Sequence, residues 1–121
     1  MSVLLWIAVI LIGGCGSVLR LVLDGAVGTR LAGDFPYGTM VINLTGAAIL
    51  GLLTGLALSS QVALLAGTAA VGSYTTFSTW MLETQRLNEE RQHVFATANV
   101  VVSLVFGVAA AALGRWIGAQ A

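Results

Sequence analysis

Charged side chains are scarce in this sequence. Its 121 residues include five basic and five acidic residues, so charged residues make up 8% of the chain, and every basic residue is an arginine. A soluble globular domain carries about a quarter charged residues. So few charges cannot cover a water-facing surface of this size, and most of the surface must therefore face lipid. With zero net charge and no lysine, the chain has no basic patch that could hold nucleic acid.

The residue patterns of enzymes are also missing. The single cysteine, Cys15, excludes an internal disulfide, and the single histidine, His93, lacks the partners that a metal site needs. The apolar runs hold no paired carboxylates, and the chain has neither a Cys-x-x-Cys motif nor a nucleotide-binding glycine loop. Serine and threonine are plentiful, but no base lies near them. We therefore predict that the chain is not an enzyme.

Four long apolar runs fill most of the chain. They cover approximately residues 3–23, 38–58, 62–82 and 94–114. Each is about 21 residues long, which at about 1.5 Å of rise per residue matches a hydrocarbon core of about 30 Å. A helix satisfies its own backbone in lipid. The sequence therefore predicts an all-α protein, a single four-helix transmembrane domain over residues 1–121, in the cell inner (plasma) membrane as a multi-pass protein.

Polar segments join these runs. Residues 24–37 and 85–93 are predicted to lie in water as loops, and residues 59–61 to form a tight helical hairpin. Arg20 lies near the end of the first run, and Asp24 follows one helical turn later, which permits an ion pair at the water boundary. In the alternative interpretation, Arg20 reaches water along the helix on its own.

The third run is the most unusual. Residues 72–80 read GSYTTFSTW, so hydroxyl side chains and a glycine stand where leucines are expected. Hydroxyl side chains offer the backbone alternative hydrogen bonds, and glycine loosens a helix. One interpretation is a kinked helix whose hydroxyls bond back to carbonyls. The other, favoured by the density of polar residues, is a broken helix whose free carbonyl and N–H groups meet an ion.

Two features of the second run bear on function. Asn43 lies a third of the way into it, where a polar side chain is costly. It serves either an interhelical hydrogen bond, worth about 0.6–2 kcal/mol, or a polar passage. Gly51 and Gly55 have GxxxG spacing, which lets helix backbones approach closely. We interpret the many glycines as support for tight packing within an oligomer.

Three motifs occur in order along the chain. They are GGCGSVLR at 13–20, PYGTMVINLTG at 36–46 and GSYTTFSTW at 72–80, the last followed by Glu83 and Thr84. In these motifs the chain resembles the Fluc (CrcB) family of fluoride channels. The family has a glycine-rich first helix that ends in arginine, a P-x-G-T-hydrophobic-x-x-N-x-x-G signature, and a G-G-x-T-T-F-S-T-F segment. The resemblance covers nearly the whole chain.

The resemblance implies a passive, fluoride-selective channel that exports fluoride from the cytoplasm and lowers its toxicity. It also implies an antiparallel dimer with a structural sodium ion at its centre. The implied fluoride pore residues are Asn43, Phe77, Thr76, Ser78, Thr79, Trp80 and Ser103. Arg20 is implied to lie near a pore vestibule, and Gly72 and Thr75 to hold the sodium ion through backbone carbonyls.

Four positions depart from the family pattern. Trp80 replaces the second phenylalanine of the third motif, and Ser73 replaces its second glycine. On the fourth run, Asn99 falls where an aromatic residue is common and Gly107 where a serine is expected. These changes concern the aromatic part of one pore more than the fold.

The arginines are distributed unevenly between the two predicted membrane sides. One side holds Arg20, Arg30, Arg86 and Arg91, and the other holds Arg115. Because loop arginines favour the cytoplasm, the chain favours an orientation with both termini outside. The partner in the implied antiparallel dimer is either a second copy of the chain or an oppositely oriented homologous subunit.

Two other classes of protein compete with a channel. A small multidrug antiporter also has four short spans, but it needs a carboxylate inside the membrane to exchange protons. Here Asp24 and Glu83 stand at the ends of runs. A non-transporting assembly subunit would explain the glycines, but it leaves the hydroxyl-rich segment 72–80 unexplained.

Overall fold

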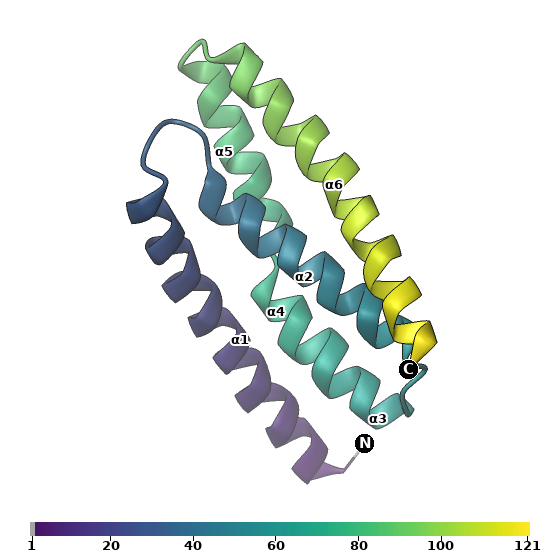
Figure 1. The fold of residues 1–121 in the computed structure, drawn as a ribbon. Helices are drawn as coiled ribbons and strands as arrows, with labels where there is room; N and C mark the ends of the chain where they lie inside the picture. Colours follow the sequence, from purple (N-terminus) through teal and green to yellow (C-terminus); the bar gives the residue numbers. More distant parts are fainter. Residues whose placement is uncertain (1) are drawn as a thin grey trace.

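The computed structural model describes residues 2–121, and every regular element in that range is a helix. Figure 1 shows four rods lying side by side, with both ends of the chain at the same end of the bundle. The prediction of an all-α protein with four helical rods is confirmed. The elements in chain order are α1 (Val3–Arg30), α2 (Tyr37–Gly55), α3 (Ser60–Val62), the π-helix η1 (Ala63–Val71), α4 (Gly72–Tyr74), α5 (Phe77–Glu89) and α6 (His93–Gln120).

Three of the rods are single helices that are long and apolar enough to cross a membrane. These are α1, α2 and α6. The third rod is composite: α3, η1 and α4 follow one another without interruption, and α5 continues the rod after a break. Neither part of the third rod spans a bilayer alone, but together they follow the direction of the other helices (Figure 1).

Three helices run beyond the predicted spans, and α6 does so by ending at Gln120, past residue 114. α1 continues to Arg30 and α5 to Glu89, so most of the predicted loop 85–93 and half of the predicted loop 24–37 are helical. Polarity marks where a chain enters water, but it does not end a helix. The chain turns at residues with positive φ: at Gly33 (150°) before α2, at Ala57 (51°) between α2 and α3, and at Arg91 (60°) before α6.

The third rod is broken at two residues. Thr75 (φ −83°, ψ 161°) and Thr76 (φ −149°, ψ 120°) both have extended backbone between α4 and α5. The predicted break in the GSYTTFSTW segment is therefore confirmed, and the hydroxyls of Ser73 and Thr75 also bond back to carbonyls, as the kinked-helix interpretation predicted. The preceding η1 has the wide turn of a π-helix, in which each N–H bonds to the fifth carbonyl before it.

Glycines bring the rods close together within the chain. On α2, Gly51 and Gly55 lie against the backbone of α6 at Ala111 and Arg115, and a methyl group at either glycine would overlap that backbone. Gly114 and Gly118 of α6 lie in the same way against α2. The GxxxG pair therefore serves packing inside one chain, where the sequence had indicated an oligomer contact.

The close contact of α2 with α6 predicts a specific sensitivity to one added methyl group. Gly51→Ala places a Cβ against the carbonyl of Ala111, and overpacking of this kind costs about 1–3 kcal/mol. We expect a lower melting temperature of the purified protein in detergent. Gly25→Ala is the matched control, because Gly25 is also helical but has no atom near its missing Cβ. Equal melting temperatures of the two variants would contradict the close packing described here.

Candidate functional site: a neutral groove at the helix break

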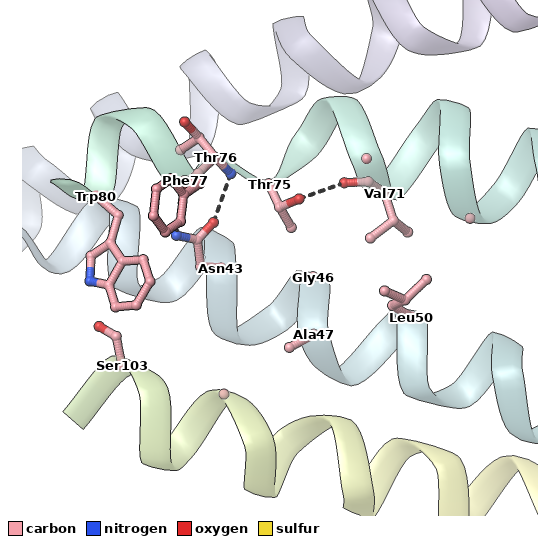
Figure 2. Close-up of a pocket in the computed structure, with 13 residues that line it drawn as sticks. Asn43, Gly46, Ala47, Leu50, Val71, Thr75, Thr76, Phe77, Trp80 and Ser103 are labelled. Atoms are coloured by element: carbon pink, nitrogen blue, oxygen red, sulfur yellow. Dashed lines mark hydrogen bonds between the residues drawn. The ribbon is translucent and has the colours of Figure 1, made fainter. Parts of the chain in front are cut away.

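An open groove of about 340 Å³ lies along α2, between the broken third rod and α6. It is lined by five of the seven predicted pore residues and by both predicted sodium ligands (Figure 2). The structure therefore brings together Asn43, Thr76, Phe77, Trp80 and Ser103 with Gly72 and Thr75.

Three predicted site residues do not line this groove. Ser78 and Thr79 instead surround the hydroxyl of Thr76 at the start of α5. Thr76 Oγ1 accepts from the backbone N–H of Thr79 at 3.2 Å, which is a typical N-cap. Arg20 lies on α1, away from the groove lining, and its Nε is buried without a hydrogen-bond partner among residues 2–121.

The carboxamide of Asn43 holds the break open. Its Nδ2 donates to the carbonyl of Thr76 at 2.9 Å, and its Oδ1 accepts from the N–H of Thr76 at 2.8 Å. Both backbone groups of Thr76, which the break removes from the helix, are thus satisfied by one side chain. The two bonds also fix which end of the amide is which, because only Nδ2 can donate. One Nδ2 hydrogen remains outside this pair.

The same bonds leave the carbonyls of two groove-lining residues without their α-helical donors. In a continuous helix the N–H of Thr76 would bond to the carbonyl of Gly72, and the N–H of Thr79 would bond to that of Thr75. Here Asn43 takes the first N–H and the Thr76 hydroxyl takes the second. Carbonyl oxygens are ligands for hard cations, so the backbone at Gly72 and Thr75 fits the predicted sodium site.

The neighbouring residues of α2 brace the break. Gly46 has no Cβ, and the methyl group of Thr75 occupies that space. The hydroxyls of Thr45 and the buried Tyr74 share a hydrogen bond of 2.8 Å. Sequence reasoning missed both roles. The sequence position of Gly46 could have indicated its role, because Gly46 follows Asn43 by three residues and so lies on the same face of α2.

Two aromatic rings form one end of the groove. Phe77 and Trp80 meet nearly edge to face, with ring centroids 5.7 Å apart and planes at 85°. The side chain of Phe77 is 70% exposed in a single chain. The indole of Trp80 is anchored, because its Nε1 donates to the main-chain carbonyl of Asn99 at 2.9 Å.

The groove contains free polar groups but no charged ones. Among residues 2–121, no acidic or basic side chain lines it. The hydroxyl of Ser103 is buried, lines the groove and has no hydrogen-bond partner in the described part of the chain. Together with the remaining Nδ2 hydrogen of Asn43, it provides a polar hydrogen at the groove that no described acceptor uses. Since the groove has no carboxylate, nothing in it supports the proton exchange of a multidrug antiporter.

The ion pair that the spacing of Arg20 and Asp24 permits is not formed within residues 2–121. The ion pair found within residues 2–121 joins Arg86 and Glu90 on the exposed end of α5, at 3.6 Å. Asp24 instead lies against Gly38 in the first turn of α2, where any Cβ would overlap its carboxylate. A carboxylate is favourable there because the N-terminus of a helix carries partial positive charge.

Comparisons with known proteins agree with these observations. Residues 7–115 match the family described as "CrcB-like protein, Camphor Resistance (CrcB)". The proteins named "Fluoride-specific ion channel FluC 2" from Mycobacterium bovis and Mycobacterium tuberculosis are each 65% identical over 97% of this chain and 93% of their own length. "Fluoride-specific ion channel FluC 1" from Leifsonia xyli subsp. xyli is 42% identical over 100% of this chain and 91% of its own.

These relatives bear on two predictions. Their names describe ion channels and not enzymes, as the missing catalytic patterns had predicted. Membership of a channel family also agrees with the long apolar helices of a multi-pass membrane protein. The match extends over nearly the whole chain, and the chain therefore belongs to the CrcB-like protein family.

Proposed function

We propose that this chain is a passive, fluoride-selective channel of the plasma membrane, which lets fluoride leave the cytoplasm and so lowers its toxicity. The names of its relatives support this function. The observation that carries the proposal is the groove at the helix break, which offers free neutral donors from Asn43 and Ser103 and has no fixed charge.

A neutral groove suits a small anion that must keep moving. Moving an ion of carboxylate size from water to a medium of low dielectric costs on the order of 20 kcal/mol before relaxation, and fluoride is smaller. One hydrogen bond to a charged group returns only about 1.5–3 kcal/mol. Several donors in series are therefore needed, such as amide, hydroxyl and the positive edges of aromatic rings. A buried arginine would instead hold the anion, and conduction requires that the ion also leave.

We propose further that the groove is completed by a second, antiparallel subunit. In one chain the groove is open, and the ring of Phe77 is mostly exposed beside it. A dyad in the membrane plane would cover both grooves at once. The partner is a second copy or a homologous subunit, and the excess of arginines at one end of this chain supports the homologue.

A sodium ion at the centre of that dimer is the third part of the proposal. The carbonyls of Gly72 and Thr75 lose their helical donors and lie on the groove. One chain supplies two such oxygens, and two chains related by a dyad would supply four. Sodium would then be a structural ion that joins the subunits, bound by neutral backbone groups.

The proposed pore predicts an effect of changing the amide of Asn43. Asn43→Asp removes the Nδ2 donor and places a carboxylate beside the carbonyl of Thr76. The carboxylate repels that carbonyl, which destabilises the break, and it also repels the permeating anion. We expect fluoride efflux from proteoliposomes to fall by at least about tenfold, the equivalent of one lost hydrogen bond to an ion. Thr54→Val is the control, since Thr54 lies on the same helix, bonds only to Leu50 and does not line the groove. Undiminished efflux through Asn43→Asp would count against the proposed pore.

Another prediction concerns sodium. Purification in potassium or N-methylglucamine buffer should dissociate the dimer or lower its melting temperature, because the freed carbonyls of Gly72 and Thr75 would face each other without a cation. Restoring sodium should reverse the change. The measurement is subunit mass in detergent with and without sodium at equal ionic strength. A dimer of equal stability in both buffers would show that these carbonyls hold no structural sodium.

A further inference from the structure

The only strong donor of the Trp80 ring is already in use. Its Nε1 donates to the main-chain carbonyl of Asn99, one turn before Ser103 on α6. Figure 2 shows the indole nitrogen on the side of the ring turned away from Asn43, and the six-membered ring on the side toward it. What Trp80 presents to the groove is therefore carbon-bound hydrogen at a ring edge.

The side chain of Asn99 secures this arrangement from the other side. Asn99 is completely buried (0% exposed). Its Nδ2 donates to the hydroxyl of Thr84 at 2.9 Å and approaches the carbonyl of Trp80 at 3.4 Å. The Thr84 hydroxyl in turn donates to that same carbonyl at 2.9 Å. We call Trp80, Thr84 and Asn99 the α5–α6 clasp.

The clasp joins two departures from the family pattern. Trp80 brings a larger ring with an N–H group, and Asn99 brings a side-chain amide where an aromatic residue is common. The main-chain carbonyl of Asn99 accepts the new N–H, and the amide bonds two oxygens of α5. The Asn99 side chain thus holds the backbone of Trp80 while the main chain at residue 99 holds its indole.

We propose that the α5–α6 clasp positions Trp80 so that its ring edge, and not its indole N–H, faces the permeating anion, which leaves the hydrogen bond at this level of the groove to the hydroxyl of Ser103, already named above as a pore donor. The inference rests on the proposed function as a fluoride channel. With its N–H held by the carbonyl of Asn99, the indole adds no N–H hydrogen bond to the anion. The ring edge attracts the anion only weakly, through the positive rim of the aromatic quadrupole.

Ser103 is suited to the donor role by its surroundings. It lines the groove, it is only 8% exposed, and its Oγ has no partner among residues 2–121. A buried hydroxyl without a partner is uncommon, because leaving it unsatisfied costs about 1–3 kcal/mol. An anion that reaches Trp80 would accept its hydrogen bond. Asn99 therefore acts as a positioning residue, and Ser103 as the residue that touches the ion.

The orientation of the indole is tested directly by hydrogen exchange. The chain has three tryptophans. Trp6 and Trp116 are mostly exposed, at 53% and 63%, and no hydrogen bond from either indole occurs within residues 2–121. Nitrogen-15 NMR of the detergent-solubilised protein, with peaks assigned by single Trp→Phe variants, should show Trp80 Nε1–H exchanging at least about tenfold more slowly than these two references.

Titration with sodium fluoride in the same samples gives the second readout. The Trp80 indole peak should not move downfield by more than the two reference peaks, because its hydrogen is held by the carbonyl of Asn99. Exchange as fast as the references, or a large downfield shift specific to Trp80, would overturn the proposal. Asn99→Leu should accelerate the exchange of Trp80, and Thr84→Val, which removes one partner only, should do so less. Thr97→Val, on the exposed face of α6, is the control.

Fluoride efflux from proteoliposomes separates the ring edge from the N–H. Trp80→Leu removes both and should lower efflux by about tenfold or more, whereas Trp80→Phe keeps a ring edge and should recover most of that loss. Ser103→Ala should lower efflux by about tenfold, the equivalent of one hydrogen bond to an ion. Equal losses in Trp80→Phe and Trp80→Leu, or full efflux through Ser103→Ala, would show that the indole N–H is the donor.

The proposed channel function and the α5–α6 clasp are contradicted by different results. If vesicles with the unmodified chain, alone or with its homologous partner subunit, release no fluoride, the proposed function is wrong. If they release fluoride while the Trp80 indole exchanges rapidly, the channel stands and the clasp is wrong.

Discussion

The structure depends on one pair of hydrogen bonds, between the carboxamide of Asn43 and the backbone of Thr76. In lipid, a helix cannot be interrupted without partners for the backbone groups that lose theirs. Asn43 meets that requirement from a neighbouring helix with one donor and one acceptor. Without it, the extended residues Thr75 and Thr76 would face hydrocarbon with unsatisfied groups, and the third rod would have reason to close into a continuous helix.

The same interruption separates donors from acceptors along the groove. Toward the N-terminal half of the third rod lie carbonyl oxygens that suit a cation, at Gly72 and Thr75. Toward α5 lie the Asn43 amide, the Ser103 hydroxyl and two ring edges, which suit an anion. A single break therefore produces two environments of opposite preference a short distance apart, and neither needs a charged side chain.

The fold was predictable from the sequence because its signals are local. Four apolar runs gave four rods, and the hydroxyl-rich segment 72–80 located the break. Helix ends were predicted poorly at Arg30 and Glu89, since polarity reports contact with water and not the end of hydrogen bonding. The contact of Gly51 with Ala111 was not predictable either, because GxxxG spacing permits a close approach without naming its partner.

The candidate site was predicted in part. The family motifs identified Asn43, Phe77 and Trp80, which line the groove, but also Ser78 and Thr79, whose hydroxyls instead bond to that of Thr76, the N-cap of α5. A motif does not show whether a hydroxyl at the start of a helix faces the groove or bonds within the first turn of that helix. The bond from Trp80 to Asn99 could not be read from the sequence, because its acceptor is a main-chain carbonyl that every residue possesses.

The π-helix η1 has a consequence for how this groove is specified. Successive residues of an α-helix point about 100° apart around its axis, and those of the wider π-helix somewhat less, so the direction of the carbonyls of Gly72 and Thr75 follows from the number of residues wound between Ala63 and Val71. A wide turn accommodates one more residue than an α-turn over the same height. The number of residues in η1 therefore sets the direction of the carbonyls that would face the ion. Deleting one residue from η1 would rotate these carbonyls without removing any polar residue of the site.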